Sequence, residues 1–226
     1  MAGWRSPTTV GVAKTTSACI YVLAGTNGAG KSSIGGAAIR ERGADYFNPD
    51  EATRRIRLAN PRISAREANS AAWHEGKRLL EEAIAKRSTF AIETTLGGET
   101  ITGLLLRALA EGIEVRIWYV GLATPELHIA RVRVRVARGG HDIPENRIQQ
   151  RFEHSRINLV RLLPQLTELR LFDNSTDADP ATGAAPTPLL VLHVVEGKIA
   201  AMCDIADVPT WAKPIVAAAV TVSNGK

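Results

Sequence analysis

The stretch Gly25-Thr26-Asn27-Gly28-Ala29-Gly30-Lys31-Ser32 follows a short apolar segment at residues 18–24 and precedes a segment with helical character at residues 31–42. It matches the phosphate-binding pattern G-x-x-x-x-G-K-[ST] in full, in the strand-to-helix context that this pattern requires. Glycines allow the backbone to curl so that several N–H groups point at phosphate oxygens, and the N-terminus of the following helix adds partial positive charge. The stretch therefore predicts a nucleotide-binding loop in an α/β fold.

Two side chains of this loop carry the predicted chemistry. We expect Lys31 to place a full positive charge against the β- and γ-phosphates of ATP, and Ser32 to ligate Mg²⁺ through its hydroxyl. The residues predicted to bind the nucleotide are Gly25, Thr26, Asn27, Gly28, Ala29, Gly30, Lys31, Ser32 and Ser33. ATPases, GTPases and kinases share such a loop, so it predicts binding and leaves transfer open. A chance glycine-rich turn is the alternative, and the flanking segments argue against it.

Apolar and helical segments alternate along the chain, an order typical of α/β proteins with a parallel sheet. The predicted strands lie at residues 18–24, 45–47, 88–93, 113–120 and 169–172. The clearest predicted helices lie at residues 31–42, 64–86, 99–111 and 145–166. We therefore predict a P-loop NTPase fold with a mostly parallel five-stranded sheet flanked by helices. Residues 189–195 and 198–203 predict an additional C-terminal β-hairpin.

Residues 131–151 predict a helical lid. Residues 131–136 alternate between basic and apolar, which also fits a half-exposed strand, but Thr-Pro-Glu at residues 124–126 is a helix start signal. The lid arginines are Arg131, Arg135 and Arg138 on one face of the first helix, and Arg147 and Arg151 on the next. Phosphoryl transfer needs such cationic groups around the γ-phosphate, with water excluded. The alternative is a solvated basic face paired with nearby acids.

Two carboxylates follow predicted strands, at the edge of the sheet where ligands of open α/β sheets bind. Asp50 follows the second strand and can accept the proton of an acceptor hydroxyl. Its alternative role is to cap a helix at residues 51–57. Glu93 ends the third strand and can bind acceptor hydroxyls or support Mg²⁺ through water, or it is only a structural strand end. No strand ends beside the loop in the conventional apolar run followed by Asp.

The composition is that of an ordinary globular protein, with 45% hydrophobic and 23% charged residues among 226. A net charge of +5 favours anionic partners, which include nucleotide phosphates, phosphorylated sugars and nucleic acid, while an aromatic content of 5% disfavours nucleic acid as the main partner. No apolar run reaches the ~18 residues of a membrane span. Cys19 and Cys203 lack metal-ligand spacing, and residues 1–17 lack the apolar core of a signal peptide. These features predict a cytoplasmic protein with a disordered lead-in at 1–17 and a single domain at 18–226.

Several motifs together resemble the zeta-toxin-like P-loop kinases over residues 21–175. Besides the loop, the motifs that carry the resemblance are Asn48-Pro49-Asp50-Glu51, Glu93-Thr94-Thr95-Leu96, Arg138-Gly139-Gly140-His141-Asp142-Ile143-Pro144, Arg151-Phe152 and Asp173-Asn174-Ser175. The resemblance implies an ATP- and Mg²⁺-dependent kinase of a toxin–antitoxin system. Its implied substrate is UDP-N-acetylglucosamine, phosphorylated on the sugar, and its implied partner is a protein antitoxin. The best-known members have Glu-Gly-Thr where this chain has Glu93-Thr94-Thr95.

The resemblance also implies roles for single residues. Asp50 matches the catalytic base, and Lys31 matches the phosphate-binding lysine. The implied contacts to the substrate sugar are Glu93 and Thr95. The implied transition-state arginines are Arg138 and Arg151.

Three functions follow as hypotheses. The first is a kinase that passes the γ-phosphate of ATP to a small molecule, and the loop, Asp50 and the arginine lid favour it. The second is an ATP-binding regulator without transfer, which gains if Asp50 only caps a helix. The third is a kinase acting on a nucleic-acid end, which would need a basic track with stacking aromatics.

Overall fold

The computed structural model describes residues 17–35, 45–140, 142–176 and 187–225. The strands of these residues are β1 Cys19–Ala24, β2 Asp45–Phe47, β3 Phe90–Thr94, β4 Glu114–Gly121, β5 Glu168–Asp173, β6 Leu189–Val195 and β7 Lys198–Met202. The helices are α1 Lys31–Ile34, α3 Pro49–Ala59, α4 Ala65–Lys86, α5 Glu99–Ala110, α6 Pro125–Ala137, α7 Glu145–Leu162 and α8 Lys213–Gly225. The predicted lead-in and the rest of the helix predicted at 31–42 lie mostly outside the described residues, as does His141.

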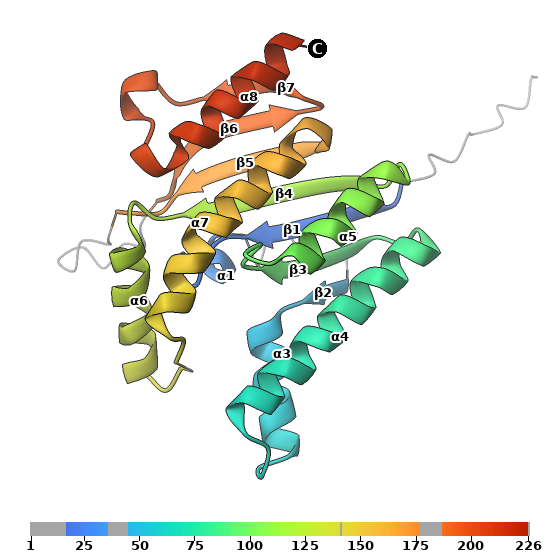
Figure 1. Cartoon of the computed structure of the whole chain (residues 1–226), viewed down its shortest axis with the longest axis vertical. Helices are drawn as coiled ribbons and strands as arrows, with labels where there is room; N and C mark the ends of the chain where they lie inside the picture. The colour runs from blue at the N-terminus through green and yellow to red at the C-terminus, as the bar shows by residue number, and fades with distance from the viewer. Residues whose placement is uncertain (1–16, 36–44, 141, 177–186, 226) are drawn as a thin grey trace, which may run out of the picture.

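Within the described residues, the strands form one sheet in the order β2-β3-β1-β4-β5-β6-β7 (Figure 1). Strands β2, β3, β1, β4 and β5 run parallel to one another, whereas β6 pairs antiparallel with β5 and with β7. The predicted α/β fold is therefore confirmed, but the sheet has seven strands and not five. The predicted C-terminal hairpin forms, and it joins the sheet at β5 because its apolar side chains, such as Val191 and Leu192, become buried there.

Helices α4, α5, α7 and α8 cover one face of the sheet (Figure 1). The main hydrophobic core lies under them, and it includes Ile20 and Val22 of β1, Leu105 of α5 and Leu159 of α7. A central strand buried on both sides reads as a continuous apolar run, as β1 does. The core fixes β1 in the middle of the sheet, so the loop that follows it emerges between the ends of β3 and β4.

Local capping signals explain where helices α3, α4 and α6 begin. Asn48 caps α3, with Pro49 at the first helical position, and Ser64 forms a capping box with Glu67 at the start of α4. Thr124 caps α6, so the helical interpretation of residues 131–136 is confirmed and the strand alternative is wrong. None of the helices in the described ranges has both the length and the apolar character needed to cross a bilayer.

Candidate active site

The glycines of the loop have conformations that other residues rarely adopt. Gly25, Gly28 and Gly30 have φ values of 139°, 83° and 84°. A Cβ on Gly25 would lie 2.1 Å from the carbonyl oxygen of Val120, and one on Gly28 would lie 2.7 Å from that of His128. The sequence pattern therefore has a steric reason, because β4 and α6 approach the loop backbone too closely for any side chain.

Lys31 points back along the loop from the first turn of α1. Its ammonium donates to the Gly25 carbonyl oxygen at 2.9 Å and lies 3.7 Å from Oε1 of Glu93. The side chain is buried, and burial lowers the pKa of Lys31, while the carboxylates of Glu93 and Asp50 oppose that shift. Two carboxylates from β3 and α3 thus hold a positive charge where the nucleotide phosphates are expected.

Glu93 lies at the end of β3, directly beside β1 in the register Leu23↔Glu93. Its Oε2 accepts hydrogen bonds from Ser32 Oγ at 2.9 Å, Tyr46 Oη at 2.8 Å and Asn48 Nδ2 at 2.8 Å. An acidic group therefore does end the strand beside the loop, as a glutamate in place of the conventional aspartate. The sequence signal was the buried apolar run that precedes it, residues 90–92.

Asp50 lies in the first turn of α3 and does not cap that helix. The cap is Asn48, whose Oδ1 accepts from the backbone N–H groups of Asp50 at 2.8 Å and Glu51 at 3.2 Å. The capping alternative for Asp50 is therefore wrong. Its half-exposed carboxylate instead lies 3.3 Å from Nη1 of Arg135, on α6. This contact joins α3 to α6.

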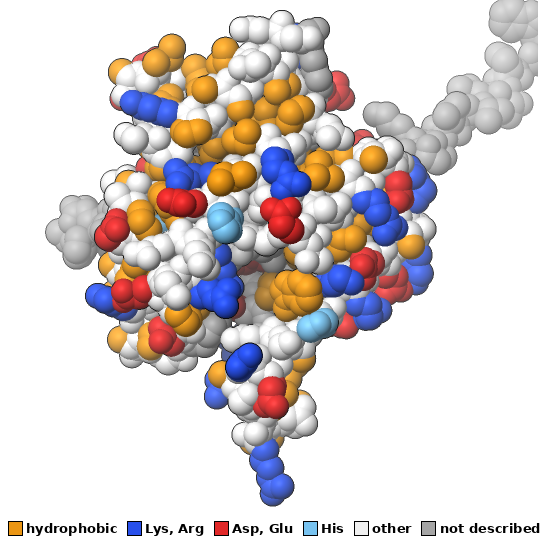
Figure 2. Space-filling model, viewed as in Figure 1, with side chains coloured by type: hydrophobic (Ala, Val, Ile, Leu, Met, Phe, Trp, Pro, Cys, Tyr) orange, Lys and Arg blue, Asp and Glu red, His pale blue; other side chains and the backbone are white. Residues whose placement is uncertain are grey.

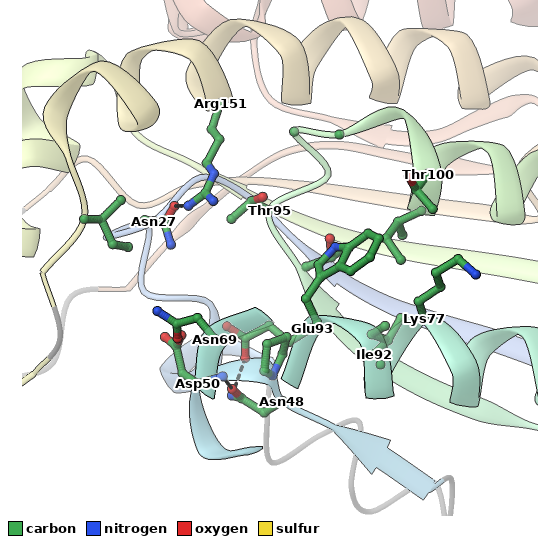
Figure 3. Close-up of a pocket in the computed structure, with 18 of the residues that line it drawn as sticks. Asn27, Asn48, Asp50, Asn69, Lys77, Ile92, Glu93, Thr95, Thr100 and Arg151 are labelled. Atoms are coloured by element: carbon green, nitrogen blue, oxygen red, sulfur yellow. Dashed lines mark hydrogen bonds between the residues drawn. The ribbon is translucent and has the colours of Figure 1, made fainter. Parts of the chain in front are cut away.

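A cavity of about 580 Å³ brings the two ends of the site together. Figure 2 shows it as a hollow on this face, with basic and hydrophobic side chains along its rim. The cavity residues next to the phosphate-binding loop are Asn27, Lys31, Asp50, Glu93, Thr95 and Arg151. Residues farther along the cavity include Phe47, Trp73, Lys77, Thr100 and Ile101, from β2, α4 and α5, while Asn69 lies beside Asp50 (Figure 3). The phosphate-binding loop therefore borders a cavity that extends beyond it to β2, α4 and α5.

The lid arginines occupy different places. Arg151 extends from α7 to Asn27, where its Nη1 donates to Oδ1 at 2.8 Å (Figure 3). A Cβ on Gly97 would lie 2.8 Å from Cγ of Arg151, so this glycine leaves the space that the arginine needs. Arg138 is exposed at the end of α6 and is not among the cavity residues, whereas Arg135, one turn earlier, contacts Asp50. The catalytic role of Arg138 stays a prediction.

Two contacts to the loop were not assigned from the sequence. His128 of α6 approaches the Asn27 carbonyl oxygen, and Asn174, after β5, donates to the Ala29 carbonyl oxygen. Asn174 belongs to one of the motifs quoted above but had no role, and His128 had no signal beyond its position in a helix. Their partners come from 101 and 145 residues away in sequence.

A phosphate-binding loop on a parallel sheet, continuous with a cavity that holds carboxylates and arginines, defines an ATP-dependent P-loop kinase. A model of the zeta toxin family matches residues 8–178. The chain belongs to the zeta toxin family, as the motifs of its sequence predict.

Individual proteins are similar to this chain in sequence or in structure. An uncharacterized protein of Haemophilus influenzae is 31% identical over 132 residues, which are 57% of this chain and 88% of the relative. Among solved structures, the AvrRxo1-ORF1:AvrRxo1-ORF2 complex matches with a TM-score of 0.64 and 16% identity, over 90% of this chain and 64% of the matched chain. This chain therefore spans less than two thirds of that neighbour.

A second neighbour is the PezAT chromosomal toxin–antitoxin system of Streptococcus pneumoniae, with a TM-score of 0.52 and 15% identity. The match covers 76% of this chain and 75% of the matched chain. At such identities the two structural neighbours show the common fold alone.

Proposed function

We propose that the chain transfers the γ-phosphate of ATP to a hydroxyl of a small molecule, with UDP-N-acetylglucosamine as the leading acceptor. One observation carries the transfer: Lys31, Asp50 and Arg151 line the same cavity, which continues beyond them into further space. Membership of the zeta toxin family supports the nucleotide-sugar acceptor, and a structure of the AvrRxo1-ORF1:-ORF2 complex with ATP supports the donor.

Each residue has a part in the transfer. Lys31 and the loop amides hold the phosphates, and Asp50 accepts the proton of the acceptor hydroxyl as the phosphoryl group leaves ADP. Negative charge on the transferring group is met by Arg151, with Arg135 held nearby by Asp50. Arg138 is the lid arginine that the family resemblance implies, and closure of α6 over the cavity would have to bring it closer.

The residues beside the loop fit a magnesium ion. Ser32 presents an exposed hydroxyl, and the carboxylate of Glu93 lies 2.9 Å from it. Hydroxyl, carboxylate and phosphate oxygens are what Mg²⁺ binds, and it uses few protein ligands. We propose that Ser32 ligates the ion and that Glu93 holds Ser32 and the ion's water shell. When bound, Mg²⁺ neutralises charge on the phosphates.

The far end of the cavity suits a ring-bearing acceptor. Trp73 of α4 lines it and is 42% exposed, and Thr100 of α5 adds a hydroxyl there, while Asn69 and Thr95 add polar groups nearer the phosphate-binding loop. An aromatic face packs against the apolar face of a ring, while amides and hydroxyls bind its substituents. A volume of about 580 Å³ is within the range of small-molecule sites. We propose Thr95 as a direct contact to the acceptor.

The Asp50→Asn variant tests the assignment of the base. We expect phosphoryl transfer to fall by ~10²–10⁴-fold while ATP binding is retained. The measurement is mass spectrometry of UDP-N-acetylglucosamine, and separately of a metabolite extract, after incubation with protein and ATP·Mg²⁺. Asp45→Asn is the matched control, because Asp45 is an exposed aspartate on β2 outside the cavity.

The outcomes separate the parts of the proposal. A fully active Asp50→Asn variant would remove Asp50 as the base. A phosphorylated product from the extract, without one from UDP-N-acetylglucosamine, would leave a kinase with another acceptor. The family and the PezAT neighbour also support a toxin with a protein antitoxin. Growth arrest of bacteria that express the wild type but not Asp50→Asn would be the expected sign, and normal growth in both would contradict it.

A further inference from the structure

Two carbonyl groups of the phosphate-binding loop lie within hydrogen-bonding distance of side chains from distant parts of the chain. Nδ1 of His128, on α6, lies 2.8 Å from the Asn27 carbonyl oxygen. Nδ2 of Asn174, after β5, donates to the Ala29 carbonyl oxygen at 2.9 Å. A loop that turns its amide N–H groups toward phosphates turns carbonyl groups the other way, and buried carbonyl groups need donors. His128 and Asn174 supply those donors.

The His128 side chain is suited to this task. It is 1% exposed, and its ring packs edge-on against Phe152 of α7, with 5.6 Å between centroids. A carbonyl oxygen only accepts, so Nδ1 carries the hydrogen of a neutral imidazole. Burial lowers the pKa of His128 to about 4, so the ring is neutral at physiological pH. The charged groups that face it also disfavour protonation, and they are Lys31, Arg131 and Arg156.

Close packing makes these bonds hard to replace by water or by movement of the loop. A Cβ on Gly30 would lie 2.6 Å from Nδ2 of Asn174, so Asn174 touches the loop backbone directly. On the other side, the backbone of α6 lies against Gly28, where a Cβ would come within 2.7 Å of the His128 carbonyl oxygen. The loop is therefore clamped between α6 and the end of β5.

Asn27 is also hydrogen-bonded to α7, in addition to its contact with α6. While its carbonyl oxygen accepts from His128 of α6, its side-chain Oδ1 accepts from Arg151 of α7 (Figure 3). One residue of the phosphate-binding loop is thus hydrogen-bonded to both helices of the lid.

We infer that His128 and Asn174 are positioning residues for the nucleotide: their N–H groups hold the Asn27 and Ala29 carbonyls outward, and thereby keep the loop amides turned toward the phosphates. Neither side chain touches the reacting groups, so their effect is on ATP affinity and not on the chemical step. The inference rests on the proposed binding of ATP at this loop, and it adds two residues that the loop pattern does not contain.

Variants at His128 separate the hydrogen bond from the bulk of the side chain. Asparagine can place an N–H donor where Nδ1 lies, whereas leucine has similar volume and no donor. We expect His128→Leu to raise the dissociation constant of ATP·Mg²⁺ at least about fivefold, as loss of one buried hydrogen bond implies. His128→Asn should stay within about twofold of the wild type, and Asn174→Ala should behave like His128→Leu. Calorimetric titration of the full chain measures each value.

A matched control excludes general destabilisation. Leu105→Ala removes a fully buried side chain of α5 outside the cavity lining, so it should lower the melting temperature and leave ATP affinity unchanged. The inference is overturned if His128→Leu binds ATP like the wild type, if His128→Asn is equally weakened, or if Leu105→Ala loses as much affinity as His128→Leu.

A spectroscopic measurement decides the matter even if a variant does not fold. In ¹⁵N-histidine-labelled wild-type protein, His128 should show the neutral tautomer protonated on Nδ1 at neutral pH. An Nε2-protonated tautomer or an imidazolium would overturn the inference. A wild-type protein that binds no ATP would contradict the proposed function, whereas the tautomer would still report on the hydrogen bond to Asn27.

Discussion

Replacing Glu93 removes a carboxylate that contacts residues from the phosphate-binding loop, from β2 and from the start of α3. Its Oε2 accepts from Ser32, Tyr46 and Asn48, and its Oε1 lies 3.7 Å from the buried ammonium of Lys31. Ser32 is exposed and Tyr46 is half-buried, so water can replace the lost acceptor for both. Asn48 is buried and loses its side-chain acceptor, and the buried ammonium of Lys31 keeps the Gly25 carbonyl oxygen but loses its paired carboxylate. The cost of the substitution therefore falls on these two groups.

The expected loss of stability can be estimated from these two groups. An unsatisfied buried amide N–H costs about 1–3 kcal/mol. Two charges 3.7 Å apart attract by about 4 kcal/mol at an effective dielectric constant near 20, in line with the ~3–5 kcal/mol cost of breaking a buried pair. We expect Glu93→Ala to lower the free energy of unfolding by about 5 kcal/mol. Glu93→Gln keeps an acceptor for Asn48 and loses the charge, so about 3 kcal/mol is expected.

Urea unfolding followed by tryptophan fluorescence measures the stability, and ADP release measures turnover, which should fall at least ~10²-fold in Glu93→Gln. Glu99→Gln is the control: Glu99 pairs with Arg161 at 2.6 Å on the surface and is 76% exposed, so its loss should cost less than ~1 kcal/mol. The reasoning is refuted if Glu93→Ala is no less stable than Glu99→Gln, or if Glu93→Gln keeps full activity with an unchanged Mg²⁺ requirement.

Two further predictions concern the lid contacts. In Gly97→Ala the new Cβ would lie 2.8 Å from Cγ of Arg151 and 3.4 Å from its Cα, so Arg151 should move away from Asn27 and turnover should fall by roughly tenfold. The control is Gly103→Ala, which has open space at its Cβ and should be fully active. Equal rates for the two variants would contradict the prediction. The pKa of His128 falls from 6.5 to about 4 on folding, so the unfolded chain binds the proton first and stability is lost as the pH drops from 6.5 toward 4. Urea unfolding at pH 7.5 and pH 5 should show a loss of about 2 kcal/mol for the wild type that is absent in His128→Asn, and parallel losses in both would disprove it.

The phosphate-binding loop could be predicted from the sequence because its structure is determined locally. Three glycines with positive φ, a lysine and a hydroxyl lie within eight residues, and the strand and helix on either side are adjacent in the chain. The motifs of the family could be predicted for the same reason. The hairpin of β6 and β7 could also be predicted, because its two strands are adjacent in the chain and its turn lies at Glu196-Gly197. That it extends the sheet depends on β5, some twenty residues earlier, and on apolar burial that no local pattern displays.

The partners of the site residues could not be predicted in the same way. Arg135 and Arg138 lie about one turn apart on the same face of a helix, so the sequence gives no means to tell which of them reaches Asp50. That choice depends on the direction in which α6 leaves the sheet after Thr124. Glu93 is a similar case, because its contact with Ser32 exists only through the pairing of β3 with β1.

The cap of α3 is different, because the sequence did contain the answer. Proline is favoured at the first position of a helix, where its missing N–H is not needed. In Asn48-Pro49-Asp50 this preference makes Asn48 the cap and moves Asp50 into the first turn, as the structure has it. There the carboxylate is favoured by the positive end of the helix and is free of a capping hydrogen bond. Pro49 thus makes Asn48 the structural cap and leaves the carboxylate of Asp50 available for the role of base that we propose for it.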